Sequence, residues 1–204
     1  MAKKKKLPNG QINDNKNKAV IKKLDDLMKD LNRNISIKVG IIGDKAYAKH
    51  PDTDITNAQL GAIHEFGADI TPTAKMRGYF WHKWGIHKSN KQIHIPTRSF
   101  LRASLLTKEG KQAINKAIKD ELSNDREINK YVGEADKSLL TDVANLVGLA
   151  AYNRVMEAFE TEGFGEWQKT TDWSKQNRKY NKANPTLVDE GTLKDSVWFE
   201  VKEK

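Results

Sequence analysis

The sequence predicts an α+β fold in which a small, mostly antiparallel sheet packs against two long helices. Two stretches of alternating apolar residues, 35–42 (ISIKVGII) and 196–202 (SVWFEVK), predict strands that lie far apart in the chain. Apolar residues at helical spacing over about 97–122 and 137–162 predict the two long helices. Because the strands come from distant parts of the chain, we expect both helices to cover one shared sheet.

The length of 204 residues fits one domain. We expect residues 16–204 to form a single α+β domain with loop insertions at about 70–92 and 163–192. Residues 1–15 begin MAKKKK, with no apolar segment behind the lysines. This pattern predicts a basic, flexible N-terminal arm and not a signal peptide.

Residues 16–33 predict an N-terminal amphipathic helix, because apolar residues recur every three or four positions between Lys and Asp. The apolar positions are Val20, Ile21, Leu24, Leu27, Met28 and Leu31. After the first strand, residues 44–54 predict a polar loop. Thr56 and Gln59 then have the spacing of a capping box, which predicts the start of a short helix. Gly67 predicts its end.

The middle of the chain predicts a joint between a strand and a helix. A short helix is expected over 73–84, followed by a strand over 91–95 that stops at Pro96, since proline cannot donate a hydrogen bond to a sheet. A helix is then expected from Thr97 to about Leu122, with a break near Gly110. Inside the later helix at 137–162, Gly148 predicts a close approach of another element.

Positive charge is concentrated in two segments of a chain whose net charge is +9. Residues 1–33 hold ten Lys/Arg against four Asp, and residues 70–108 hold eight Lys/Arg and no acidic residue. The rest of the chain is therefore net acidic. Basic segments of this kind attract nucleic acid or acidic protein surfaces, but they also occur as solvated faces.

Residues 75–88 (KMRGYFWHKWGIHK) allow two interpretations. Aromatic faces interleaved with cations can stack on bases and neutralise phosphates. The spacing of Met76, Phe80 and Trp84 also fits the inward stripe of a short helix. The candidates for contact with DNA or an acidic partner are Lys75, Arg77, Lys83, Lys88 and Lys91.

The sequence predicts no catalytic, metal or cofactor site. Cysteine is absent, and no run of about 18 apolar residues exists that could cross a membrane. His82, His87 and His94 lack the spacing and the carboxylate of a helical zinc site. No serine lies in a Gly-x-Ser-x-Gly turn, and no phosphate-binding Gly-rich loop is present. A metal-dependent nuclease remains a weaker alternative, because the acidic residues are scattered along the chain.

Four motifs occur in a characteristic order. They are Val39-Gly40-Ile41 at the end of a strand, NAQLGAIHEFGA at 57–68, IPTRSFLR at 95–102 and TLVDEGTLKDSV at 186–197. In this order they resemble the neck and tail-completion proteins of tailed bacteriophages, of the virion-morphogenesis type. The resemblance spans about 37–201 and assigns structural roles to Gly40, Glu65, Gly67, Pro96, Phe100, Gly191, Leu193 and Ser196. The last motif departs from the family pattern, with Glu190 where threonine is common and valine at position 188.

The resemblance implies a structural virion protein without enzymatic activity or cofactor. Such a protein forms a ring, hexameric by analogy, at the head–tail junction after assembly in the host cytoplasm. The implied partners are further copies of the chain, the adjacent head–tail connector and tail-terminator proteins, and genomic DNA in the channel, but no membrane. The residues expected to contact a neighbouring subunit or partner are Arg98, Arg102, Trp167 and Trp173.

Two alternatives stay open at this point. Arg98 and Arg102, four residues apart at the start of a predicted helix, would project to one side and suit charge-assisted bonds to a neighbour. They would equally suit bonds to carbonyl groups within their own subunit. For the function, the alternative is a nucleic-acid-binding module that uses residues 70–108.

Overall fold

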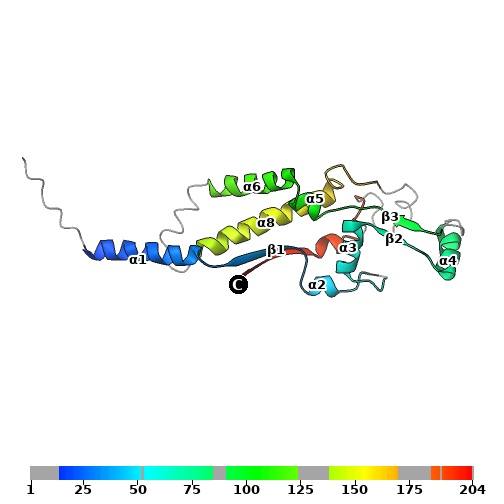
Figure 1. The fold of residues 1–204 in the computed structure, drawn as a ribbon, viewed down its shortest axis with the longest axis horizontal. Helices are drawn as coiled ribbons and strands as arrows, with labels where there is room; N and C mark the ends of the chain where they lie inside the picture. The colour runs from blue at the N-terminus through cyan, green and yellow to red at the C-terminus, as the bar shows by residue number, and fades with distance from the viewer. Residues whose placement is uncertain are drawn as a thin grey trace, which may run out of the picture.

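The computed structural model describes residues 14–51, 53–84, 91–123, 138–169, 185–188 and 190–203 of the chain. The molecule is elongated: α1 (Asp14–Leu31) projects at one end and α4 (Ala74–Trp84) at the other (Figure 1). Between them lie the strands β1 (Ile35–Ile41) and β4 (Val197–Glu203), packed against α8 (Leu139–Glu160). The mixture of helices with small antiparallel sheets confirms the predicted α+β class.

The two strands predicted at 35–42 and 196–202 pair with each other. β1 and β4 are antiparallel, with a register that runs from Ile35 opposite Glu203 to Ile41 opposite Val197. Val39 and Val197 point toward α8 and help to form the core, whereas Lys38 and Lys202 are exposed on the other face. The alternation that predicted the strands is therefore also the alternation between core and solvent.

α8 packs against this sheet through its smallest residues. A Cβ atom added at Gly148 would lie 2.3 Å from Cδ2 of Phe199, so the helix and β4 are as close as a glycine allows. The buried positions of α8 are Ala144, Gly148, Ala151, Val155, Ala158 and Phe159. Larger residues that the periodicity placed in the core, such as Leu146 and Val147, remain half-buried beside this face.

The core is centred on Phe100, whose side chain is fully buried. Its ring centroid lies 4.9 Å from that of Phe159 on α8, and the ring of Trp167 meets Phe159 edge-on at 6.0 Å. Leu193 and Val197 complete the cluster from the C-terminal part of the chain. Phe100 thus occupies the core position that the sequence predicted for it.

The strand predicted at 91–95 does not join the central sheet. β3 (Ile93–Ile95) pairs with β2 (Ala68–Ile70), antiparallel, with Ala68 opposite Ile95. β2 was not predicted, because three residues reading Ala-Asp-Ile show no recognisable alternation. The expectation of one shared sheet is therefore wrong: the described residues form two separate two-stranded sheets.

β2, α4 and β3, which we call the arm, project from the body of the molecule (Figure 1). The segment 70–92, predicted as a loop insertion that holds a short helix, thus begins in a strand and continues into the eleven-residue helix α4. The inward stripe expected for α4 does not face a core, because Met76 is 37% exposed and Phe80 is only half-buried. The side chain of Trp84 lies outside the described residues.

The capping box is confirmed at the start of α3 (Asn57–Phe66). The Thr56 hydroxyl accepts a hydrogen bond from the Gln59 amide at 3.2 Å, and the Gln59 side chain accepts one from the Thr56 amide at 2.8 Å. Gly67 ends the helix with φ of 75°, in the region that favours glycine. The preceding segment 44–54, predicted as a loop, contains the short helix α2 (Asp44–Tyr47).

The helix predicted from Thr97 to Leu122 is divided differently in the structure. It consists of α5 (Arg102–Leu105) and α6 (Lys108–Leu122), so residues 97–101 are not helical. The break does not fall at Gly110, which lies inside α6. A Cβ there would lie 2.0 Å from the Ser104 carbonyl oxygen, so glycine allows α6 to pass close to α5. A further short helix, α10 (Thr192–Asp195), precedes β4.

α1 has the predicted amphipathic pattern, but the described part of the chain does not cover its apolar face. Ile21, Leu24, Met28 and Leu31 are between 49% and 62% exposed. Its C-terminal end is anchored near the start of α8 (Figure 1). No helix in the described residues is long and apolar enough to cross a membrane.

The anchor of α1 is a polar network. The Asp30 carboxylate accepts hydrogen bonds from the Ser138 hydroxyl at 2.6 Å and from the Leu140 amide at 3.1 Å, at the start of α8. Arg33 donates to Asp30 at 2.7 Å and to Glu203 on β4 at 2.7 Å. Burial alone would raise the pKa of Asp30, but the bonds from Ser138, Leu140 and Arg33 outweigh it and lower the pKa.

Candidate functional site

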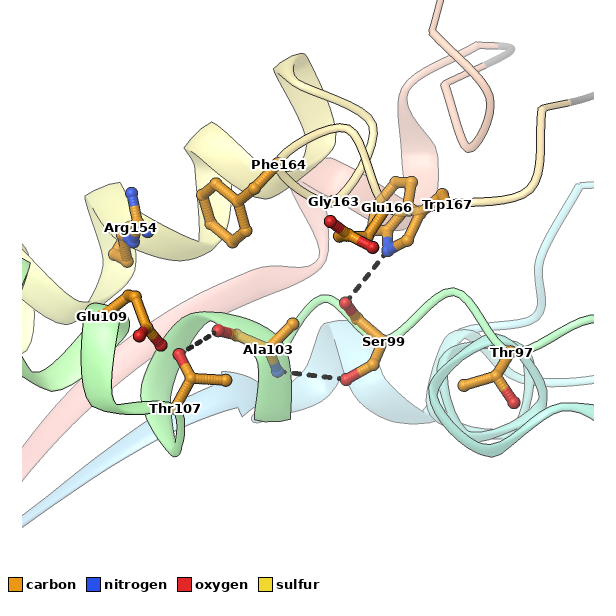
Figure 2. Close-up of a pocket in the computed structure, with 10 residues that line it drawn as sticks. All are labelled: Thr97, Ser99, Ala103, Thr107, Glu109, Arg154, Gly163, Phe164, Glu166 and Trp167. Carbon is orange, nitrogen blue, oxygen red and sulfur yellow. Dashed lines mark hydrogen bonds between the residues drawn. The ribbon is translucent and has the colours of Figure 1, made fainter.

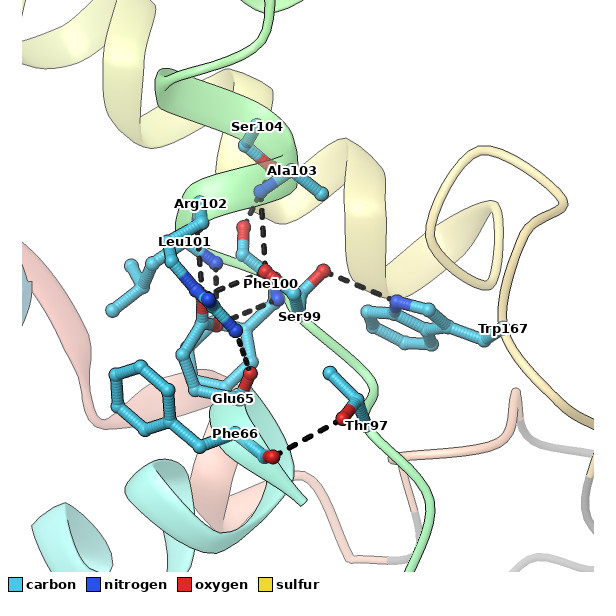
Figure 3. A network of polar contacts seen from close by, with 10 residues as sticks. All are labelled: Glu65, Phe66, Thr97, Ser99, Phe100, Leu101, Arg102, Ala103, Ser104 and Trp167. Carbon is cyan, nitrogen blue, oxygen red and sulfur yellow. Dashed lines mark hydrogen bonds and ion pairs between the residues drawn. The ribbon is translucent and has the colours of Figure 1, made fainter.

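Glu65, the second-last residue of α3, organises the segment between Pro96 and α5. Its carboxylate accepts hydrogen bonds from the Ser99 hydroxyl at 2.6 Å and from the amides of Phe100, Leu101 and Arg102, each at 2.9 Å. Figure 3 shows these donors converging on the carboxylate. The chain bends around Glu65 here, which explains why no helix begins at Thr97.

The charge of Glu65 is balanced by Arg102. The guanidinium Nε lies 3.0 Å from the carboxylate, a second nitrogen donates to the Glu65 carbonyl oxygen, and the group stacks 4.5 Å from the centroid of the Phe66 ring. Burial alone would raise the pKa of Glu65, but the bonds from Ser99, Leu101 and Arg102 outweigh it and hold the pKa below its ordinary value. Glu65 is therefore an ionised structural anchor, with its oxygens already occupied by donors.

The base of the arm is fixed to the same segment. The Thr97 hydroxyl donates to the Phe66 carbonyl oxygen at 3.1 Å, and the Arg98 amide donates to the His64 carbonyl oxygen at 2.7 Å. A Cβ at Gly67 would lie 2.9 Å from the Thr97 hydroxyl oxygen, so glycine is needed where the two arm strands meet the body. These contacts set the direction in which the arm projects.

His64, whose carbonyl oxygen accepts the hydrogen bond from the Arg98 amide, has an imidazole that is held neutral. Burial lowers its pKa to about 4, and the charges of Arg98 and His50 contribute in the same direction. Its Nδ1 atom is buried and has no hydrogen-bond partner among the described residues. A protonated His64 would place a second positive charge near that of Arg98, so the imidazole fits this position only in its neutral form.

A cavity of about 550 Å³ lies between residues 97–109 and the turn that follows α8 (Figure 2). Ala103, Phe164 and Trp167 contribute apolar surface, and Thr97, Thr107, Glu109 and Glu166 contribute polar groups. The Trp167 indole donates from Nε1 to the Ser99 carbonyl oxygen at 3.1 Å. One wall of the cavity is thereby tied directly to the segment that Glu65 organises.

The turn at 161–167 has an unusual backbone. Glu162 and Phe164 have positive φ values of 53° and 60°, a conformation that side-chain-bearing residues adopt rarely. Gly163 lies between them, and a Cβ there would lie 2.1 Å from Nε1 of Trp167. Such backbone conformations persist where surrounding contacts hold them, and they concentrate at binding sites.

Arg154 forms the cationic part of the cavity. Its guanidinium carbon lies 3.8 Å from the centroid of the Phe164 ring, and one terminal nitrogen donates to Glu157 at 2.7 Å. The Nε atom is buried without a hydrogen-bond partner in the described part of the chain. Glu109 and Glu166, both exposed, also line the cavity. The walls are thus mainly apolar, and the two carboxylates exceed the one guanidinium.

The two arginines predicted to contact a neighbour both bond within their own chain. Arg98 donates from Nε to the Gln168 carbonyl oxygen at 3.1 Å, and Arg102 bonds Glu65. They do not share a helix face, because α5 begins only at Arg102. Of the other two residues predicted to make such contacts, Trp167 is buried in the core and Trp173 lies outside the described residues.

The basic candidates lie on or near the arm. Lys75 is exposed on α4, and Arg77 on the same helix is half-buried and donates to the Pro72 carbonyl oxygen at 2.8 Å. Lys91 is exposed just before β3. The side chain of Lys83 and the whole of Lys88 lie outside the described residues.

The residues that carry the family resemblance lie close to this joint. Glu65, Gly67, Pro96 and Phe100 form or flank it, and a Cβ at Gly40 would lie 3.8 Å from the Leu101 side chain. In the last motif, Gly191 precedes α10 with φ of 89°, in the left-handed region. Leu193 is in the core cluster with Phe100, and the buried Ser196 hydroxyl donates to the Leu193 carbonyl oxygen at 2.6 Å.

No pattern in the sequence pointed to the cavity residues Arg154 and Phe164. Arg154 follows from the helical repeat as a polar position on α8, and nothing in the spacing places it over an aromatic ring. The only local signal was the pair Gly163 and Gly165 around Phe164, which is typical of a tight turn.

Within the described residues, no group of three or more His, Asp or Glu side chains is placed to hold a metal ion. Comparisons of the chain with protein-family models, with curated proteins and with solved structures find no match.

Proposed function

We propose that this chain is a structural virion protein of a tailed phage or phage-like particle. It forms a ring at the head–tail junction and acts there as a neck or tail-completion protein. The observation that carries the proposal is that the four resembling motifs, which are spread along the sequence, lie together in space. Glu65 of the second motif binds the backbone of the third, and the third shares a core cluster with Leu193 of the fourth.

This convergence supports the resemblance because motifs that a family shares for structural reasons should contact one another. Gly40 of the first motif also approaches Leu101 of the third. The four motifs would then describe one structural unit, in which each motif supplies a contact that the others need. The polar groups of this unit hold its backbone in place. The Glu65 carboxylate, for example, accepts hydrogen bonds from Ser99, Phe100, Leu101 and Arg102.

The shape of the molecule also suits a component of an assembly. α1 and the arm project at opposite ends and expose apolar side chains, including Met28 at 62% and Tyr79 at 50%. Exposed apolar surface on projecting elements is typical of contact surfaces between proteins. The proposed partners are further copies of the chain, the neighbouring connector and tail-terminator proteins, and DNA in the channel, where a basic segment is favourable.

Electron microscopy of the purified full-length chain over a range of concentrations tests the proposal. We expect closed rings of uniform diameter, accompanied by a sedimentation coefficient that matches a small integral number of copies. A chain that remains monomeric throughout, or that cleaves DNA in the presence of Mg²⁺, would contradict a structural ring.

The second candidate is a nucleic-acid-binding module. It is favoured by α4, where Tyr79 and Trp81 are 50% and 44% exposed near the exposed Lys75. A module of this kind binds DNA as a monomer, with an affinity that falls steeply as salt increases. Measuring DNA binding by the monomer at several salt concentrations separates the two functions, because the ring proposal expects tight binding only after assembly.

A further inference from the structure

The tip of the arm presents an aromatic and basic surface. On α4, Met76, Tyr79 and Trp81 are 37%, 50% and 44% exposed. Lys75 is exposed beside them, and the sequence from 70 to 108 contains no acidic residue. Aromatic residues, Met and Arg are the side chains enriched at the centres of protein–protein interfaces.

The cavity beside the joint has the complementary properties. Its volume of about 550 Å³ lies within the usual range for binding pockets and exceeds the volume of one aromatic side chain. Phe164 and Trp167 provide apolar and aromatic walls, and the exposed Glu109 and Glu166 provide negative charge. The basic and aromatic tip of the arm fits such a site better than an acidic or a purely polar ligand would.

The arm cannot fill the cavity of its own chain. In Figure 1, α4 lies at one end of the molecule, and β2 and β3 separate it from α5 and α8, which border the cavity. The direction of the arm is fixed at its base, where Thr97 bonds Phe66 and Gly67 allows close contact. The tip of the arm and the cavity are therefore separate surfaces of one chain.

We propose that the tip of the arm of one copy docks into the cavity of the next copy, with Tyr79 or Trp81 entering the cavity beside Phe164. The exposed Lys75 then lies near Glu109 and Glu166 of the neighbour, which gives the contact electrostatic complementarity. This inference rests on the proposed ring and names the contact that builds it.

The contact is heterologous, because two different surfaces of the chain meet. Contacts of this kind generate a ring when the rotation between neighbours closes, and an open filament when it does not. Since Trp167 is bonded to Ser99 and Arg98 to Gln168, docking at the cavity would engage the same segment that sets the direction of the arm. Each copy would thus receive its neighbour at the base of its own arm.

Cross-linking between single-cysteine chains tests the contact directly. The sequence contains no cysteine, so Tyr79→Cys and Glu166→Cys each introduce one reactive thiol at an exposed position. When the two variants carry different tags and are mixed, a short bismaleimide should join them into a mixed dimer. Tyr47→Cys serves as the control partner for Tyr79→Cys, because Tyr47 is 81% exposed on α2 but does not line the cavity.

Charge reversal provides a second, independent test. Lys75→Glu and Glu166→Lys should each weaken self-association at least tenfold, measured by sedimentation, and the chain carrying both changes should recover much of the loss. Both residues are exposed, so circular dichroism and urea unfolding should show an unchanged fold. Lys38→Glu, an exposed change on β1, is the matched control and should leave association unaltered.

The outcomes separate this inference from the proposed function. If the unchanged chain forms rings, but the 79–166 cross-link does not form and the charge reversals have no effect, this contact is wrong and the ring proposal stands. If the cross-link joins copies into open filaments, the contact is supported and the closed ring is contradicted. If the chain does not associate and no cross-link forms, both proposals fail.

Discussion

At the scale of the residue, Glu65 holds together two elements that are distant in the sequence. Its carboxylate lies almost fully buried, with 5% of the side chain exposed, yet it remains ionised because Ser99, three amides and Arg102 donate to it. Hydrogen bonds to a charged acceptor are stronger than those to a neutral one. One side chain thereby connects the end of α3 to the start of α5.

Replacing Glu65 by Gln should lower the free energy of unfolding by about 2–4 kcal/mol, because a neutral amide removes the charge and turns one acceptor into a donor. Urea unfolding followed by circular dichroism measures the change. Glu109→Gln, at an exposed position, is the control and should shift the free energy by less than about 0.5 kcal/mol. An equal effect of both changes would refute the anchoring role.

Two neighbouring residues should give stability two different pH windows. The pKa of His64 is lowered from 6.5 to about 4, so the folded state stays neutral while the unfolded state takes up a proton. Stability contributed by the neutral imidazole is complete above pH 6.5 and is lost as the pH falls toward 4, at up to about 1.4 kcal/mol per pH unit. The pKa of Glu65 is also lowered, and its contribution is lost below its unfolded value of 4.5.

Urea unfolding at several pH values between 4.5 and 7 tests the His64 window. We expect His64→Gln to flatten the dependence of stability on pH in this range, and Glu65→Gln to leave its slope intact. A wild-type stability that does not change between pH 7 and pH 5 would show that His64 is not held neutral by the fold.

At the scale of the element, the sequence predicted those features that are encoded locally. The alternation at 35–42 and 196–202, the capping box at Thr56, and the stop at Pro96 each depend on residues within a few positions of one another. The start of α5 and the existence of β2 depend instead on partners more than twenty positions away, namely Glu65 for the first and β3 for the second. Periodicity carries no information about such partners, and the cavity between the turn after α8 and residues 97–109 was missed for the same reason.

Gly148 provides a test of how closely α8 packs on the sheet. In an isolated helix, Gly148→Ala would stabilise by about 1 kcal/mol. In this chain the added methyl group would overlap the Phe199 ring, so we expect a net loss of about 1–3 kcal/mol in urea unfolding. Gly78→Ala on α4 is the matched control, since no atom of the described residues outside the nearby backbone of α4 lies within 4 Å of the added Cβ, and it should not destabilise. A stabilised Gly148→Ala chain would mean that α8 and β4 are further apart.

At the scale of the whole molecule, the core lies at the centre, and α1 and the arm remain outside it at the two ends. Among the residues that the structure describes, the buried cluster around Phe100 and Phe159 includes none from α1 or from the arm. The amphipathic pattern of α1 predicted a covered helix, but amphipathicity shows only that a face is apolar and does not identify what it packs against. The stability of the fold and the exposed apolar surface therefore reside in different parts of the chain.

This separation predicts that the apolar face of α1 contributes little to folding. The double change Leu24→Lys and Met28→Lys should alter the free energy of unfolding by less than about 1 kcal/mol, because both side chains are more than half exposed. Chemical unfolding at low protein concentration, where association is absent, makes the measurement. A loss of about 3 kcal/mol or more would show that the face is buried within the folded monomer.

The pairing of β1 with β4 has a consequence for how the chain is made. Arg33 and Glu203, which meet at one end of this sheet, are 170 residues apart. At a synthesis rate of roughly 5–20 residues per second, β1 leaves the ribosome on the order of 10–30 s before its partner strand. During that interval α8 can form and cover the apolar face of β1, but the hydrogen bonds along its edge must wait. Closing so long a loop is also slow for entropic reasons, so the central sheet should be among the last parts of a newly made chain to form.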